Sequence, residues 1–242
     1  NGEYIPTAFI DSEMWIEALN RIGFEIIDIS GGEPFLQPGI IEILKRVKGK
    51  IGITSNLTMP MAEFMSEVSP DKVVSITASY HPSQTLGFDQ FIGRVLLLKA
   101  KGFNITVNFV GHPDQMYLIP ALKKNIDGLG VRFHVDPYVP YLKPYPFSDQ
   151  EKEFLSKFVG SDREHYLKEA KISTKKCSAG KTHLHIQPNG DAYRCYTDFV
   201  QKKPKIGNIF EKSFRGSSGD GDCSIWSKCL GCDKDKVDIY DK

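Results

Sequence analysis

The chain has 242 residues, of which 40% are hydrophobic and 25% charged, and its formal net charge is +1. This composition is ordinary for a globular protein, and the charge provides no attraction to nucleic acid or to a membrane surface. No apolar run approaches the roughly 20 residues of a transmembrane helix, and the sequence does not open on a signal peptide. We therefore expect a cytoplasmic protein with one large domain, with or without a small appendage.

Strand and helix patterns alternate through the first 138 residues. Runs rich in Val, Ile and Phe predict strands at 24–29, 50–54, 72–79, 104–110 and 131–135. Apolar residues at helical spacing predict helices at 12–22, 38–48, 59–68, 88–101 and 116–126. Regular alternation implies parallel strands with helical crossovers, and therefore either a barrel or an open wound sheet. The first strand, which contains Ile26, Ile27 and Ile29, is expected to be buried.

Each predicted strand ends in polar or turn-forming residues. After the first strand comes Gly31-Gly32-Glu33-Pro34, in which the glycines allow a sharp turn and a close approach to a ligand, and the proline fixes the exit direction. The other strands end in Ser55-Asn56, Ser79-Tyr80-His81, Gly111-His112 and Asp136-Pro137-Tyr138. Since α/β proteins bind their ligands at the carboxyl ends of parallel strands, these endings predict a ligand site. Ordinary turn chemistry is the alternative for each ending taken alone.

The chain changes character after residue 137. Residues 137–146 are rich in proline and tyrosine and predict an extended connection, whose aromatic residues are also candidates to line a substrate mouth. Helices are predicted at 149–158 and 162–170. A hairpin follows, with strands at 183–187 and 192–196 joined by a turn at 188–191.

All five cysteines lie in the last third of the chain, at positions 177, 195, 223, 229 and 232. In a reducing compartment such a group indicates metal ligation before disulfides. The turn from Cys229 to Cys232 presents two sulfurs to one metal, and a hairpin bearing Cys177 and Cys195 supplies two more. Four thiolates suit structural zinc or a [4Fe–4S] cluster, and local spacing does not separate the two. Buried cysteines without a metal are the remaining alternative.

Two of these motifs resemble those of one enzyme family. The segment Gly31-Gly32-Glu33-Pro34 resembles the motif with which radical S-adenosylmethionine (SAM) enzymes hold the methionine amino group of that cofactor. The spacing of Cys177, Gly190 and Cys195, followed by the Cys229–Cys232 pair, is similar to the auxiliary-cluster modules of the same family, called SPASM or, in the single-cluster form, twitch. The segments 185–195 and 206–209 are similar to that module too. Five cysteines are too few for a two-cluster SPASM domain, so the twitch form is expected.

The resemblance implies a fold and a set of ligands. The fold would be α/β: a partial (β/α)6 TIM-like barrel over residues 1–146, a helical connector over 147–176 and a twitch/SPASM-like β-hairpin and helix domain over 177–242. The cluster ligands would be Cys177, Cys195, Cys229 and Cys232, with Cys223 outside the set. SAM would be held at its methionine end by Gly31, Gly32, Glu33 and Pro34, at its ribose and carboxylate by Ser55, Asn56, Ser79 and Asn108, and near its adenine by Asp136.

One departure from the family pattern is serious. Radical SAM enzymes hold the cluster that cleaves SAM on a Cys-x3-Cys-x2-Cys loop, and this sequence has no such loop because its first cysteine is Cys177. The family places that loop just before a helix that precedes the Gly-Gly-Glu strand. We therefore expect the first barrel strand, its loop and a second [4Fe–4S] cluster to lie upstream of Asn1.

The activity implied by the resemblance is the oxidation of a small molecule or peptide. A 5′-deoxyadenosyl radical would abstract hydrogen, and the auxiliary cluster would accept the further electron that dehydrogenation or an oxidative cross-link must lose. A flavodoxin or ferredoxin would supply the reducing electron. Two alternatives stay open: a non-enzymatic scaffold with a structural zinc, and a zinc hydrolase. For the hydrolase, His183 and His185 share a strand face but are expected to pack or face solvent, and His81 and His112 read as loop residues before prolines.

Overall fold

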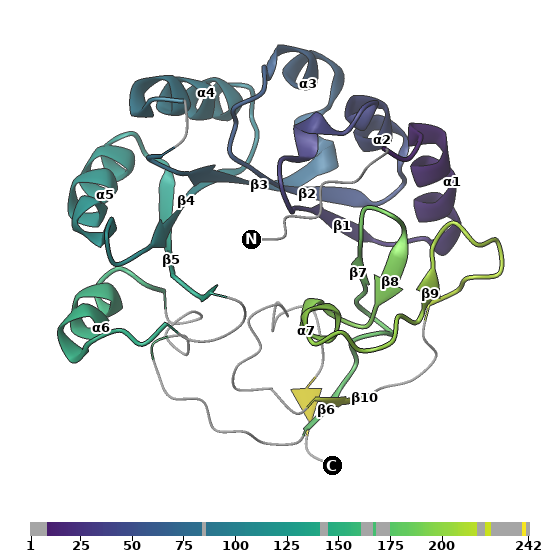
Figure 1. The fold of residues 1–242 in the computed structure, drawn as a ribbon. Coiled ribbons are helices and arrows are strands. Elements are labelled where there is room, and N and C mark those ends of the chain that lie inside the picture. The colour runs from purple at the N-terminus through teal and green to yellow at the C-terminus, as the bar shows by residue number, and fades with distance from the viewer. Residues whose placement is uncertain are drawn as a thin grey trace. The chain divides into compact units, whose positions relative to one another are not determined.

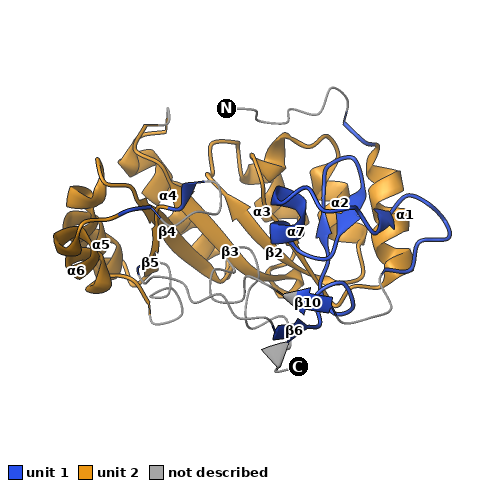
Figure 2. Ribbon diagram, turned by 60° about the horizontal axis from the view of Figure 1, so that its bottom comes forward, with its two compact units in different colours: residues 1–10, 139–146, 164–242 blue, residues 11–138, 147–163 orange. Residues whose placement is uncertain are grey.

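A computed structural model describes residues 9–83, 86–140, 145–160, 167, 175–216, 221–223 and 239–240. The chain separates into two compact units (Figure 2). The sheet unit comprises residues 11–138 and 147–163, and the cysteine-rich unit comprises residues 1–10, 139–146 and 164–242.

The sheet unit contains one five-stranded sheet in the order β1-β2-β3-β4-β5, and every pair of neighbouring strands is parallel. Its helices α1 to α5 lie along one face of the sheet (Figure 1). All five predicted strands and the helices between them are present, which confirms the partial α/β barrel. The strands are β1 (Ile26–Ile29), β2 (Lys50–Ser55), β3 (Val73–Tyr80), β4 (Ile105–Gly111) and β5 (Arg132–Pro137). The α-helices are α1 (Ser12–Ile22), α2 (Ile40–Arg46), α3 (Ala62–Glu67), α4 (Phe88–Ala100), α5 (Ile119–Gly128) and α6 (Asp149–Ser156).

Short 3-10 helices account for two of the differences from the predicted elements. The single helix predicted over 116–126 is divided into η3 (Met116–Leu118) and α5, and η2 (Pro70–Lys72) leads into β3. Another, η1 (Pro34–Leu36), follows directly on Glu33. The predicted ends of α1 are confirmed: the Asp11 side chain accepts a hydrogen bond from the Glu13 amide, and Gly23 ends the helix with a φ of 81°, as a glycine C-cap does.

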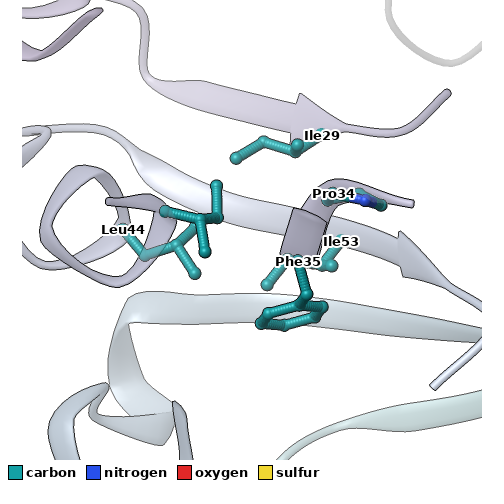
Figure 3. Close-up of a pocket in the computed structure, with 6 residues that line it drawn as sticks. Ile29, Pro34, Phe35, Leu44 and Ile53 are labelled. Atoms are coloured by element: carbon teal, nitrogen blue, oxygen red, sulfur yellow. The ribbon is translucent and has the colours of Figure 1, made fainter. Parts of the chain in front are cut away.

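The apolar core of the sheet unit lies between the sheet and these helices. Strand residues such as Ile53, Val107 and Phe109 are at most 3% exposed, and burial of each such side chain contributes about 1.5–3 kcal/mol. A close-up of this core shows that η1 inserts Pro34 and Phe35 among Ile29, Leu44 and Ile53 (Figure 3). The turn after β1 is therefore anchored by its own apolar residues.

Strand β1 is not buried as predicted. Ile26 is 52% exposed, and the four residues of the strand alternate between exposed and half-buried. The reason is its place at the edge of the sheet, where β2 is its only partner among the described strands. A β-branched composition alone does not distinguish an edge strand from a central one.

The cysteine-rich unit contains two small three-stranded sheets. In one, β6 (Lys175–Cys177) pairs with β10 (Gly221–Cys223) and β11 (Ile239–Tyr240), and in the other β8 (Asp191–Tyr193) pairs with β7 (His185–Ile186) and β9 (Gly207–Asn208). The predicted hairpin is thus confirmed as β7–β8. The turn between its strands needs Gly190, whose φ is 83° and whose Cβ would overlap the Phe210 ring.

Two details of this region differ from the prediction. Cys177 lies on β6, in a separate sheet from the hairpin, and Cys195 lies beyond β8, at the N-cap of a short helix α7 (Tyr196–Val200). The expected boundaries at residues 146 and 176 stay predictions, although α6 belongs to the sheet unit. The helix predicted over 162–170 lies outside the described residues, apart from Leu167.

Candidate cofactor site and cysteine module

The turn after β1 is fixed to the end of β2 by the Glu33 carboxylate. Its Oε1 accepts hydrogen bonds from the Ser55 hydroxyl at 2.8 Å and the Phe35 amide at 3.3 Å, and its Oε2 accepts one from the Asn56 amide at 2.9 Å. A carboxylate has about four acceptor sites, so these three donors leave about one for a ligand. The structure thus brings Gly31–Pro34 together with Ser55 and Asn56, as the predicted site requires.

The residues after β2 continue this hydrogen-bonded network. The Ser55 hydroxyl also accepts a hydrogen bond from the Leu57 amide, and the Asn56 side-chain Oδ1 accepts hydrogen bonds from both the amide and the hydroxyl of Thr58. Leu57 is fully buried and has a φ of 56°, a conformation that is strained for a leucine. These bonds hold the strained residue in place, so the edge of the site is rigid.

The two glycines of the turn serve different purposes. Gly31 has a φ of 122°, which a residue with a side chain rarely adopts. Gly32 has no such backbone requirement, and a Cβ built on it would meet nothing within 4 Å among the described residues. Neither packing nor conformation within the sheet unit explains a glycine at 32. Its bare backbone is therefore open to close approach by a ligand.

The face of β1–β5 opposite the helices is lined mainly by polar side chains, and we call it the polar face. Because side chains alternate along a strand, the register of the sheet places Ser79, Asn108 and His134 side by side on β3, β4 and β5. Nearer the amino ends, Thr54, Thr77 and Thr106 form a similar row. Asp136 follows His134 on this face, and the two side chains are 3.2 Å apart from Nε2 to Oδ1.

On this face, Asn108 is the residue that most clearly indicates a bound molecule. The side chain is buried, at 9% exposure, and its Oδ1 accepts no hydrogen bond from any described residue. A buried carbonyl oxygen without a partner costs about 1–3 kcal/mol, so proteins satisfy such atoms with water or a bound molecule. This atom lies in one row with Ser79, another predicted site residue. Asn56 and Ser79 each follow the last residue pair between β2 and β3, and Asp136 lies two residues beyond His134 on β5.

The sequence reasoning missed His134 and the row of threonines. A signal was present: residues 75–79 and 105–109 alternate between polar and apolar, which is typical of a strand with only one apolar face. The sequence analysis described these strands only as rich in Val, Ile and Phe and did not use that alternation. It would have identified Ser75, Thr77, Thr106 and Asn108 together.

Cys177 and Cys195 are both buried in the cysteine-rich unit. The Ala179 amide donates a hydrogen bond to the Cys177 sulfur at 3.4 Å. Arg194, next to Cys195, donates to the Ala179 carbonyl at 3.0 Å and the Cys177 carbonyl at 3.4 Å. One guanidinium therefore holds the two cysteine segments together, although 18 positions separate them in the sequence.

Little is described of the other three cysteines. The proposed ligands Cys229 and Cys232 lie outside the described residues, and Cys223, which is not a proposed ligand, is described only by its backbone, which pairs with Lys175 across β10 and β6. Within the described part of the chain, no group of three or more His, Cys, Asp or Glu residues is arranged to hold a metal. A four-cysteine site would need Cys229 and Cys232.

The histidines of this unit pack against aromatic rings. His185 lies 5.2 Å from the Tyr196 ring and 5.4 Å from the Phe199 ring, and it contacts the Gln187 side chain. Burial, together with the charge of His183, lowers the pKa of His185 to about 4. This environment is that of a packed, neutral histidine, as the sequence analysis expected. It offers nothing in favour of a zinc hydrolase.

Comparison with known families identifies the cysteine-rich segment. The model of the SPASM family, described as an iron–sulfur cluster-binding domain, matches residues 177–216. This range contains Cys177 and Cys195. A search of curated proteins finds no significant match.

Solved structures match most of the chain. Streptococcus suis SuiB bound to S-adenosylmethionine is 20% identical with a TM-score of 0.63, over 85% of this chain and 58% of SuiB. SuiB bound to precursor peptide SuiA is 18% identical with a TM-score of 0.61, over 85% and 57%. The anSMEcpe structure with bound AdoMet and the Cp18Cys peptide is 13% identical with a TM-score of 0.55, over 92% and 72%.

These comparisons confirm the resemblance for the fold and for the cysteine module. The chain shares the fold of the SuiB and anSMEcpe structures, and residues 177–216 match the SPASM model. It spans 58% of the length of SuiB. Within the described residues, no helix is both long and apolar enough to cross a membrane.

Proposed function

We propose that this protein is a radical SAM enzyme that oxidises its substrate with the help of an auxiliary [4Fe–4S] cluster. The observation that carries the proposal is the pairing, in one chain, of a SAM-enzyme barrel fold with a SPASM match that contains two buried cysteines. A degenerate barrel with structural zinc would share the cysteines, but nothing would then demand the polar face or the open backbone at Gly32.

The sheet unit fits SAM at three points. Gly32 leaves room for the methionine end against bare backbone, and Glu33 keeps about one acceptor site for the ammonium group. Asn108 offers a buried oxygen that a ribose hydroxyl satisfies. Ser55, Asn56, Ser79 and Asp136 complete the proposed set around these three points. The cofactor carries the radical chemistry, while the protein binds and orients it.

The proposed reaction removes two electrons and two hydrogens from the substrate. When bound and reductively cleaved, SAM supplies a 5′-deoxyadenosyl radical that takes one hydrogen atom. The substrate must then lose one electron and one proton to become a stable oxidised product. A cluster held by Cys177, Cys195, Cys229 and Cys232 has all four irons ligated, so its role is to accept that electron rather than to bind substrate.

We propose a peptide as the substrate class. SuiB and anSMEcpe have been solved with peptides bound. In this chain, the polar face carries side chains from strands β2 to β5. The reducing electron would come from a flavodoxin or ferredoxin. The second cluster, which cleaves SAM, would be held by a Cys-x3-Cys-x2-Cys loop in the full-length protein. A reducing cytoplasm suits both clusters.

The test uses full-length protein reconstituted with iron and sulfide under anaerobic conditions. We expect about eight irons per chain, in two [4Fe–4S] clusters, and formation of 5′-deoxyadenosine on addition of SAM and dithionite, measured by mass spectrometry. Zinc in place of iron, with no deoxyadenosine formed, would overturn the proposal and favour the scaffold.

A second measurement tests the assigned SAM residues. We expect Gly32→Val and Glu33→Ala to weaken SAM binding in calorimetric titrations at least tenfold, because the first blocks the backbone and the second removes the ammonium acceptor. Gly93→Val is the matched control, since its Cβ also meets nothing within 4 Å but lies on helix α4. Wild-type affinity in both site variants would refute the assignment.

A further inference from the structure

The cysteine-rich unit contains a second buried polar atom without a partner. The Thr197 hydroxyl is on α7, the residue is 4% exposed, and its Oγ1 makes no hydrogen bond with any described residue. Leaving a buried hydroxyl unsatisfied costs about 1–3 kcal/mol. Proteins keep such groups where water, an ion or a cofactor satisfies them.

The position of Thr197 in α7 explains why the chain itself does not satisfy it. A threonine inside a helix bonds its hydroxyl to the carbonyl four residues earlier, but for Thr197 that residue is Tyr193, which belongs to strand β8. The intervening Cys195 is extended, with φ −155° and ψ 168°. The neighbouring buried carboxylate of Asp198 is engaged by Lys203 at 2.6 Å and lies 4.0 Å from Arg194.

Thr197 is close to a proposed cluster ligand. Cys195 is the N-cap residue of α7, and Thr197 is the second residue of the helix. The Cys195 side chain makes no capping hydrogen bond, and the Thr197 hydroxyl makes none to it. A cluster bound through Cys195 would bring further sulfur atoms to the start of α7, where this hydroxyl lies. Cys177 already has a comparable arrangement, because its sulfur accepts a hydrogen bond from Ala179, also two residues further on.

We infer that the Thr197 hydroxyl donates a hydrogen bond to a sulfide of the auxiliary cluster held by Cys195 and thereby raises the reduction potential of that cluster. The inference rests on the proposed iron–sulfur site. Hydrogen bonds to cluster sulfurs stabilise the reduced, more negative state and are one of the means by which a protein sets the potential. Thr197 is therefore a positioning and tuning residue that does not touch the substrate. It makes the auxiliary cluster a better electron acceptor.

The test is a redox titration of reconstituted full-length protein, followed by electron paramagnetic resonance. The auxiliary cluster is the signal that does not change when SAM is added. Thr197→Val keeps the shape and removes the donor, so we expect its midpoint potential to shift to more negative values. Thr197→Ser keeps the donor, and we expect it to retain the wild-type potential. Iron content is measured for each variant.

The outcomes separate this inference from the proposed function. If wild-type protein binds no iron at the auxiliary site, the proposed function fails. If wild-type and Thr197→Val carry equal iron and have the same potential, the inference fails while the proposed function survives. If Thr197→Val and Thr197→Ala lose iron while Thr197→Ser keeps it, the hydroxyl is needed and the inference holds. Loss of iron in all three variants shows a packing role and overturns it.

Discussion

The two proposed sites of this chain lie in different units and are built by different means. The proposed SAM site lies at the end of a five-stranded sheet, and an apolar core and the Glu33 network hold it. In the cysteine module, the described elements are strands of two or three residues and a five-residue helix. Its described cysteines are tied together by polar bonds from Arg194. The first site is built by burial of apolar surface, and the second by specific polar bonds, to which the proposed cluster would add metal–sulfur bonds.

This difference predicts which kind of change destabilises each unit. A sheet with a large core tolerates the loss of one hydrogen bond, because burial supplies most of its stability. A small module with little apolar core folds only when a metal or cluster adds its binding energy. Removal of a bound metal or cluster should therefore unfold the cysteine-rich unit and leave the sheet unit folded.

The largest expected effect is on the cluster ligands. Replacing Cys177, Cys195, Cys229 or Cys232 singly with serine should remove most of the auxiliary iron and expose residues 175–242 to proteolysis, while the sheet unit stays protected. Cys223→Ser is the control and should keep both iron and protection. Iron analysis and limited proteolysis followed by mass spectrometry measure both effects. If Cys223→Ser loses iron and one of the other four variants keeps it, the ligand set is wrong.

A slightly smaller effect is expected for Arg194→Met. This change removes the donors to the Cys177 and Ala179 carbonyls, and hydrogen bonds from a charged group contribute about 1.5–3 kcal/mol each. We expect iron to be retained poorly and lost faster to a chelator. Gly221→Ala should act in the same direction, because its Cβ would overlap the Arg194 guanidinium.

Arg215→Met is the control for this position. Arg215 also donates to two backbone carbonyls, those of Lys212 and Phe214, but both lie within three residues of it. It joins no distant segments, so its loss should leave iron retention unchanged. Equal chelator rates for the Arg194 and Arg215 variants would contradict the role assigned to Arg194.

The same contrast explains what could be predicted from the sequence. The strands and helices of the sheet unit follow from apolar periodicity, because their formation is dominated by burial. The pairing of Ser55 and Asn56 with Glu33 also follows, since neighbouring parallel strands end at one edge of a sheet. The exposure of Ile26 does not follow, because it depends on which strand lies at the edge.

The cysteine module is harder to predict for a physical reason. Cys177 precedes the hairpin as expected, on β6, but Cys195, expected on the second hairpin strand, lies at the start of α7. The bond that joins them comes from Arg194, whose partners are backbone carbonyls that carry no sequence signal. The orphaned Asn108 and Thr197 atoms are likewise visible only once the burial of each atom is known.

In the sheet unit, we expect a smaller effect from Ser55→Ala. The serine is 2% exposed and its hydroxyl bonds both Glu33 and the Leu57 amide, so its loss should destabilise the unit by about 1–3 kcal/mol. SAM affinity should fall as well, because the Glu33 carboxylate loses a fixed partner. Urea unfolding and calorimetry measure the two effects. Ser66→Ala, which removes an exposed hydrogen bond on α3, should change neither. If Ser66→Ala and Ser55→Ala lower the stability equally, the Glu33 network stabilises the unit no more than an exposed hydrogen bond does.

The smallest effect concerns pH and belongs to the cysteine-rich unit. The pKa of His185 is lowered from 6.5 to about 4 by burial and by His183. Between these values the unfolded chain binds a proton that the folded unit does not, so stability falls as the pH is lowered from 6.5 towards 4. Above pH 6.5 this contribution is fully present. Protonation would place a charge beside the Tyr196 and Phe199 rings and the Gln187 side chain.

We expect hydrogen exchange in β7 and β8 to become faster between pH 6.5 and 4.5, after correction for the intrinsic pH dependence of exchange. His185→Gln should remove most of this acceleration, because glutamine does not titrate. His134→Gln is the matched control, since His134 lies in the sheet unit and should leave the exchange of β7 and β8 unchanged. The same acceleration in the His185→Gln variant would assign the pH dependence to another group. The contrast between a unit stabilised by its apolar core and one stabilised by polar bonds would then rest on the cysteines and Arg194 alone.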